Sequence, residues 1–225
     1  MSVSELSASH QNYLKAIWSL TEWSDAPVTP SDLAARVGVR LSTASDAVKK
    51  LTEQGLAHHE PYGAISLSEQ GREYAVMMVR RHRLIETFLV SVLGYTWDQV
   101  HDEAETLEHA VSDFLVERLD RYLGYPRRDP HGDPIPAADG TVTLPDAFPL
   151  VDVAPNSRVR IERISDDDPG LLQYFSERGI DIGDDVEVRA GSPYSDAIEI
   201  TVLPAGETLP LGEIAAAQVW VSPLT

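Results

Sequence analysis

The spacing of apolar residues changes from helical to strand-like along this chain, and that change limits the folds it can adopt. Up to about residue 123, apolar side chains recur every three or four positions, as on amphipathic helices. Residues 125–155 hold seven of the chain's 15 prolines and indicate an irregular connector. Beyond residue 156, short segments alternate apolar and polar residues as strands do. We therefore expect a mainly α-helical chain that ends in a small, SH3-like β-barrel.

The first third of the chain has the element order of a winged helix-turn-helix. Helices are predicted over residues 4–24, 32–37 and 41–54, and a short hairpin follows the third helix. Thr29 before the second helix and Gly38 after it are typical cap residues. This order favours a DNA-binding domain, although helix-turn-helix shapes also occur in proteins that bind no DNA.

The third predicted helix carries polar and basic residues where such domains contact DNA. Residues at the start of this helix normally reach base edges in the major groove, and lysines further along can meet phosphates. The expected DNA contacts are Arg40, Ser42, Thr43, Asp46, Lys49 and Lys50.

The net charge of −18 is distributed unevenly between the two parts of the chain. Residues 1–83 hold nine basic and nine acidic residues, whose charges cancel. Residues 84–225 hold nine basic and 27 acidic residues and carry the whole excess. The first part can therefore approach a polyanion, whereas the second would repel one and attract cations.

The composition also excludes several classes of site. The chain has no cysteine, which rules out disulfides, thiolate zinc sites, iron–sulfur clusters and cysteine nucleophiles. No apolar run reaches the roughly 18 residues of a membrane helix, and the N-terminus lacks the apolar core of a signal peptide. We expect a cytoplasmic protein that does not bind membranes.

Two predicted helices, over residues 68–93 and 97–123, each place His and Glu side chains on one face. The second set has offsets of 0, 4, 7 and 8, and the first is an i, i+4 pair. The sets are His101, Glu105, Glu108 and His109 on one helix, and His82 and Glu86 on the other.

If these helices pack together, the carboxylates would repel one another and lose solvation, and a divalent cation would offset both costs. The donors are all oxygen and nitrogen, which suits Mn(II) or Fe(II), although other divalent transition metals can substitute. The alternative interpretation is a solvated acidic helix face with incidental histidines. The aspartate run 166–168 is by itself best explained as a capping loop.

The segments VRRHRLIETFL and VHDEAETLEHAVSD, behind a winged helix, resemble the diphtheria toxin repressor family of metal-dependent transcriptional repressors. The connector sequence DPHGDPIP also resembles this family, and the similarity extends over nearly the whole chain. The resemblance implies a winged helix-turn-helix over 1–74, a helical dimerisation and metal-binding domain over 75–145, and an SH3-like, FeoA-like domain over 150–225.

One position distinguishes two branches of that family. Iron-type members carry Cys at the position of Glu105, and manganese-type members carry Glu, so this chain is similar to the manganese transport regulators. The resemblance implies a primary metal site of Asn12, Glu105, Glu108 and His109, and an ancillary site of His82, Glu86, His101 and Asp168. Asn12 stands where the manganese branch usually has Asp and the iron branch Met. Its amide offers a carbonyl oxygen but no negative charge.

The function implied by the resemblance is a Mn(II)-activated homodimer that binds double-stranded operator DNA and represses manganese homeostasis genes. Such a protein is not an enzyme. An Fe(II)-dependent repressor of the same family and a DNA-binding protein with a purely structural metal remain as alternatives. A dinuclear carboxylate/His metal enzyme is a further alternative, but it leaves the winged helix unused, and no separate nucleophile or base accompanies the metal donors.

Overall fold

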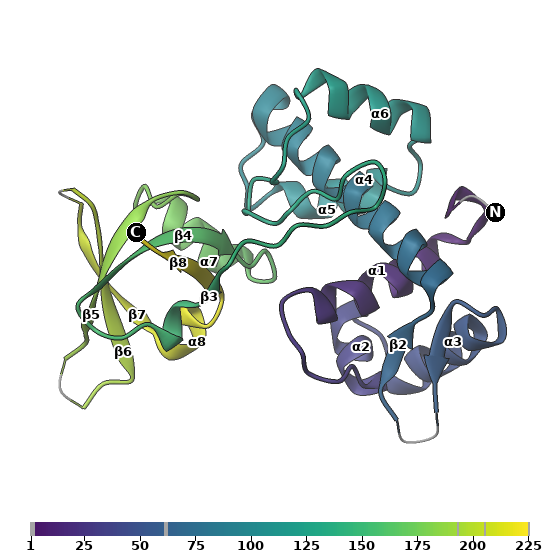
Figure 1. Ribbon diagram of the computed structural model, residues 1–225, viewed down its shortest axis with the longest axis horizontal. Helices are drawn as coiled ribbons and strands as arrows, with labels where there is room; N and C mark the ends of the chain where they lie inside the picture. Colours follow the sequence, from purple (N-terminus) through teal and green to yellow (C-terminus); the bar gives the residue numbers. More distant parts are fainter. Residues whose placement is uncertain (1–2, 61–62, 193, 205, 225) are drawn as a thin grey trace. The chain divides into compact units, whose positions relative to one another are not determined.

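The computed structural model describes residues 3–60, 63–192, 194–204 and 206–224, and it divides into two compact units (Figure 1). The first unit contains the chain up to Ile85 together with Glu105–Tyr125 and Ile135–Thr141. The second contains Glu86–Ala104, Pro126–Pro134 and the chain from Val142 onward. The predicted mixture of a helical N-terminal part and a C-terminal β domain is confirmed.

The first unit begins with the predicted winged helix-turn-helix (Figure 1). Helix α1 contacts α2, α3 and β2, and β1 pairs with β2 in an antiparallel hairpin. Leu14, Ile17, Leu33, Val48 and Leu51 form its buried interior. The elements are η1 (Val3–Glu5), α1 (Ala8–Glu22), α2 (Pro30–Val37), α3 (Leu41–Glu53), β1 (Ala57–His59) and β2 (Ile65–Leu67).

Local capping chemistry sets the ends of these helices. The Ser7 hydroxyl accepts a hydrogen bond from the His10 N–H, so α1 starts at Ala8 and not at residue 4. Thr29 and Asp32 form a reciprocal capping box at the start of α2, where the hydrogen bonds from Thr29 lower the pKa of Asp32. Gly38 ends α2 with a φ of 69°, a left-handed conformation that glycine adopts readily.

The chain between β2 and the connector contains three helices, one more than the sequence predicted. Helix α4 (Glu69–Leu93) matches the first predicted helix, but the second is divided into α5 (Val100–Leu107) and α6 (Asp113–Tyr122). Ser112 caps α6 by accepting a hydrogen bond from the Leu115 N–H, which starts a new helix there. The prediction of one continuous helix over 97–123 is therefore wrong, and Glu108 and His109 lie in the turn after α5.

The second unit contains a six-stranded antiparallel sheet with the strand order β3-β8-β4-β5-β6-β7 (Figure 1). Ile161, Phe175, Val186 and Val221 are buried in its core together with Trp97 from the α4–α5 loop. The elements are β3 (Phe148–Pro149), η2 (Leu150–Asp152), β4 (Ser157–Ile164), α7 (Pro169–Ser176), β5 (Asp185–Ala190), β6 (Ala197–Val202), β7 (Thr208–Gly212), α8 (Glu213–Ala216) and β8 (Val219–Pro223).

Part of the connector packs directly on this sheet. The Ile164 N–H donates a hydrogen bond to the His131 carbonyl oxygen, and Gly132 adopts a φ of 91° beside β4. A Cβ at Gly132 would lie 2.1 Å from the Glu162 carbonyl oxygen, so the close approach requires glycine. This contact fixes the segment that carries Asp129 and His131.

Within the described residues, no helix is both long and apolar enough to span a bilayer.

Candidate metal centre

In the first unit, Lys15, His82 and Glu105 form a polar cluster around the buried carboxylate of Glu108. Its side chain is fully inaccessible to solvent, and both of its oxygens contact the Lys15 ammonium group of α1, at 2.7 and 2.8 Å. The same ammonium group forms a short ion pair with Glu105. The structure thus brings together two of the predicted primary donors and ties them to α1 through a lysine that the sequence did not single out.

His82 also contacts this carboxylate. Its Nδ1 lies 2.6 Å from Oε2 of Glu108 and 3.4 Å from the Lys15 ammonium nitrogen. Burial by itself would raise the pKa of Glu108, but the His82 imidazole and the Lys15 ammonium group together lower it below its usual value. Glu108 is therefore held as a carboxylate, the form that binds metal ions. His82, predicted for the ancillary set, lies beside a donor of the primary set.

His109 presents one ring nitrogen for metal binding because the other is already used. Its Nδ1 lies 2.6 Å from the side-chain oxygen of Gln11. The side-chain nitrogen of Gln11 donates a hydrogen bond to the Val3 carbonyl oxygen at 2.8 Å. The Gln11 oxygen must therefore accept, so His109 donates from Nδ1 and keeps a lone pair on Nε2. Metal-binding histidines are commonly oriented by such a second hydrogen bond.

Two predicted primary donors have buried atoms that need a partner. The Nε2 atom of His109 and the Oδ1 atom of Asn12 are both buried, and neither has a hydrogen-bond partner among the described residues. Asn12 lies one turn before Lys15 on α1, and His109 Nε2 is 3.7 Å from Oε1 of Glu108. Two lone-pair donors and two carboxylates fit a hard divalent cation, which would satisfy the buried atoms and balance the charge.

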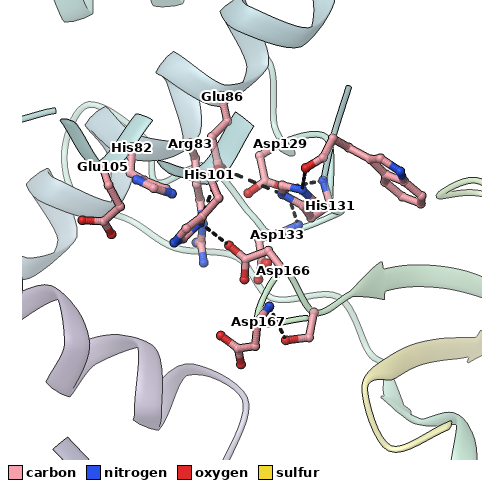
Figure 2. A network of polar contacts seen from close by, with 12 residues as sticks. His82, Arg83, Glu86, His101, Glu105, Asp129, His131, Asp133, Asp166 and Asp167 are labelled. Carbon is pink, nitrogen blue, oxygen red and sulfur yellow. Dashed lines mark hydrogen bonds and ion pairs between the residues drawn. The ribbon is translucent and has the colours of Figure 1, made fainter. Parts of the chain in front are cut away.

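A second cluster lies within the second unit, around His101. The Nδ1 atom of His101 is 2.9 Å from Oδ2 of Asp166 and 3.5 Å from Oε1 of Glu86, and Figure 2 shows the imidazole facing the Asp166 carboxylate. Burial lowers the pKa of His101, but hydrogen bonds to Asp166 and Glu86 more than offset this and raise it to about 10. Once His101 releases its proton to solvent, these three side chains offer a nitrogen and several carboxylate oxygens to a cation.

Asp168 was the acid expected in the ancillary site, but its carboxylate caps a helix. It is the N-cap of α7, where Oδ1 accepts hydrogen bonds from the N–H groups of Gly170 and Leu171 at 2.9 and 3.3 Å. Asp166, two residues earlier, is the member of the aspartate run that contacts His101. The sequence of three identical aspartates could not show which of Asp166 and Asp168 contacts His101, because this depends on the residue at which α7 begins.

The predicted DNA-contacting residues all lie on the exposed face of α3 or at its start. The opposite face carries Ala44, Ala47, Val48 and Leu51, which are buried. Lys49 makes a long ion pair of 3.9 Å with Glu53, which leaves its ammonium group largely in solvent. The exposed set is Arg40, Ser42, Thr43, Asp46, Lys49 and Lys50.

Comparison with known families supports the division into DNA-binding, metal-binding and barrel regions. The N-terminal DNA binding domain of the iron dependent repressors matches residues 5–65. Their metal binding and dimerisation domain matches residues 68–137, and the FeoA domain matches residues 148–223.

Individual relatives resemble the chain over most of its length. The diphtheria toxin repressor of Corynebacterium glutamicum is 31% identical over 191 residues, which cover 78% of this chain and 81% of that protein. The iron-dependent repressor IdeR of Mycobacterium tuberculosis is 37% identical over 138 residues, covering 60% of this chain and 58% of that protein.

Two solved structures are similar to this one across nearly the whole chain. A manganese-dependent transcriptional repressor in complex with manganese has a TM-score of 0.91 at 50% identity, covering 96% of this chain and 100% of that one. The manganese regulator SloR has a TM-score of 0.80 at 33% identity, covering 96% of this chain and 98% of that one.

The Lys15 ion pairs generate a prediction about stability. Lys15→Met keeps most of the aliphatic stem but removes the charge that Glu105 and Glu108 share. In the presence of a chelator, this variant should lose about 1–3 kcal/mol of folding free energy, since the buried Glu108 carboxylate loses its ammonium partner and keeps the His82 contact. Mn(II) should then stabilise the variant more than the wild type, because no ammonium group competes for the carboxylates.

Thermal unfolding with and without Mn(II) measures both effects, and Lys49→Met, at an exposed lysine, is the matched control. Equal melting temperatures and equal Mn(II) shifts for Lys15→Met and the wild type would show that Lys15 is not a partner of these carboxylates.

Proposed function

Because this chain belongs to the diphtheria toxin repressor family of metal-dependent transcriptional repressors, we propose that it is a Mn(II)-activated repressor. The observation that carries the choice of metal is the donor set around Glu108. The carboxylate and amide oxygens are hard donors, the imidazole nitrogen is intermediate, and Glu105 supplies oxygen where a thiolate would favour softer metals. Similar structures described as manganese-dependent support the same choice.

Once the Lys15 ammonium group is displaced, charge balance is compatible with a divalent ion at this site. Glu105 and Glu108 together carry two negative charges, while Asn12 and His109 are neutral donors. Because Mn(II) binds N and O ligands less tightly than later first-row metals, its selection depends on coordination number and on the metal that the cell supplies. Fe(II) takes the same donors, and the similarity to iron-dependent repressors keeps it as the second candidate.

The metal would act on DNA binding through α1. This helix packs against α2 and α3, so its position affects the helix that reads DNA. Asn12 comes from α1, whereas Glu105, Glu108 and His109 come from the end of α5 and the turn after it. A bound divalent ion supplies one positive centre that these donors share.

Fixing α1 to the α5 turn lowers the conformational entropy that DNA binding must otherwise remove. Lys15 makes a weaker version of the same connection, because an ammonium group carries one charge and imposes no coordination geometry. A typical coupling of about 1–3 kcal/mol corresponds to roughly 5–150-fold in DNA affinity.

We propose that Glu86, His101 and Asp166 form the ancillary site. The contact of 2.9 Å between His101 and Asp166 favours Asp166 over Asp168, whose carboxylate already caps α7. His82 is hydrogen-bonded to Glu108, so it would orient a primary donor.

Family membership implies a homodimer on DNA, and α6 offers an apolar surface for the partner. Phe114, Leu115 and Tyr122 are exposed on this helix. A two-fold dimer would place two copies of α3 in successive major grooves, about 34 Å apart on a palindromic operator. Binding would block transcription of genes for manganese homeostasis.

The first test is the metal dependence of DNA affinity. The full chain, loaded with Mn(II), first selects a DNA duplex from a random pool. The affinity of the chain for this duplex is then measured with each of the divalent ions of Mn, Fe, Co, Ni and Zn. Mn(II) should raise the affinity by roughly 5–150-fold, and Glu108→Gln should abolish that rise while sedimentation still shows a dimer. Affinity that does not respond to any metal would refute the proposal, and activation by Zn(II) alone would refute the choice of Mn(II).

The matched control for this test is Glu117→Gln, which changes an exposed carboxylate on α6. It should respond to Mn(II) as the wild type does. A Glu108→Gln chain that still responds to Mn(II) in the same way would contradict the site assignment.

A second test concerns the DNA-contacting face. Lys50→Gln should weaken binding to specific and unrelated duplexes by a similar factor, because a phosphate contact carries no sequence information. The slope of log affinity against log salt should fall by about one. Arg178→Gln in the barrel is the control, and an unchanged slope for Lys50→Gln would exclude a phosphate contact.

A further inference from the structure

A second group of possible metal ligands lies beside the His101 cluster, between α4 and the connector. Glu86, Asp129 and His131 each place a donor atom within 4.8 Å of the others' donor atoms. Glu86 is 1% exposed, Asp129 8% and His131 0%, so the whole group is buried. In Figure 2 the Asp129 and His131 side chains lie next to each other, to the right of Glu86.

The His131 ring is oriented in the way expected for a metal ligand. Its Nε2 lies 2.9 Å from the Trp97 carbonyl oxygen, which can only accept, so Nε2 carries the hydrogen. The ring also stacks on the Trp97 side chain with an interplanar angle of 9°. Nδ1 is buried, has no hydrogen-bond partner in the described part of the chain, and lies 3.9 Å from Oε2 of Glu86. A histidine fixed through one nitrogen and aimed with the other at a carboxylate is prepared to bind a cation.

Asp129 is held equally firmly. Its Oδ1 accepts hydrogen bonds from the backbone N–H groups of His131 and Asp133, both at 2.9 Å. The next acid in the connector, Asp133, has its own cationic partner in Arg163, at 2.7 Å. Glu86 and Asp129 both lie close to the His131 imidazole. Burial lowers the pKa of His131, but the charges of Asp129 and Glu86 raise it, which reflects the negative potential at Nδ1.

Glu86 connects the two clusters through its two oxygens. Its Oε1 is 3.5 Å from Nδ1 of His101, and its Oε2 is 3.9 Å from Nδ1 of His131. A carboxylate whose oxygens face separate nitrogen donors can bridge two cations. Such an arrangement shares one negative charge between two metal ions that would otherwise repel each other.

We propose that Glu86, Asp129 and His131 bind a divalent cation of their own, joined through the Glu86 carboxylate to the cation held by His101 and Asp166. The donors are two carboxylates and one imidazole, so the site takes Mn(II) or Fe(II), and water completes the coordination. The bridging part of this inference rests on the proposed ancillary site, whereas the set of Asp129 and His131 stands on its own geometry. The site ties the connector to α4 within the second unit.

Anomalous diffraction tests the position directly. Crystals of the full chain are soaked in Mn(II), and data are collected on both sides of the Mn absorption edge. The proposal requires an anomalous peak within coordinating distance of His131 Nδ1, in addition to a peak near His101. Peaks near Glu108 and His101 with none near His131 would overturn it and leave the proposed function intact.

Metal stoichiometry tests the same site in solution. Equilibrium dialysis should show one Mn(II) fewer per chain for Asp129→Asn than for the wild type, because the amide still accepts the backbone N–H groups but lacks the charge. His131→Gln should lose the same ion. The control is Asp139→Asn, an exposed connector aspartate whose carboxylate also accepts a backbone N–H.

Equal stoichiometry for wild type, Asp129→Asn and His131→Gln overturns the proposal. If either variant does not fold, the anomalous map of the wild-type chain decides. Mn(II)-dependent DNA affinity is measured in parallel, since its absence in the wild type would refute the proposed function whatever the number of ions bound.

Discussion

The structure of the first unit depends on the need to neutralise one buried carboxylate. Glu108 has no solvent-exposed side-chain surface, and an unpaired charge in that position would cost several kcal/mol. The chain meets this cost with His82 from α4 and Lys15 from α1, which converge on the same carboxylate group. The charge of Glu108 therefore determines which helices must lie together, and any cation that replaces Lys15 acts on the same contacts.

This constraint gives the proposed metal ion a route to α3, the helix proposed to contact DNA. Helix α1 is both a wall of the winged helix-turn-helix and the carrier of Gln11, Asn12 and Lys15. Gln11 fixes the His109 ring, so α1 also determines which nitrogen is offered to a metal. In the proposed function, coupling between metal and DNA would need no long pathway, because α1 carries a proposed metal donor and packs directly against α3.

Much of this arrangement was predictable from the sequence, and the exceptions have physical causes. The caps at Thr29 and Gly38 and the helical spacing of apolar residues predicted the winged helix correctly. The break at Ser112 was missed because apolar residues continue at helical spacing across it. Lys15 and Glu108 are 93 residues apart, so no local pattern could reveal their contact. The choice between Asp166 and Asp168 depends on the exact start of α7, which a run of identical residues does not disclose.

The most direct measurement is the affinity of the full chain for Mn(II), by calorimetry, with and without a saturating selected duplex. Linkage requires that DNA strengthen Mn(II) binding by the same factor by which Mn(II) strengthens DNA binding. We expect the two factors to agree and to exceed about fivefold. A chain that binds the duplex tightly but has the same Mn(II) affinity with and without it would contradict the account.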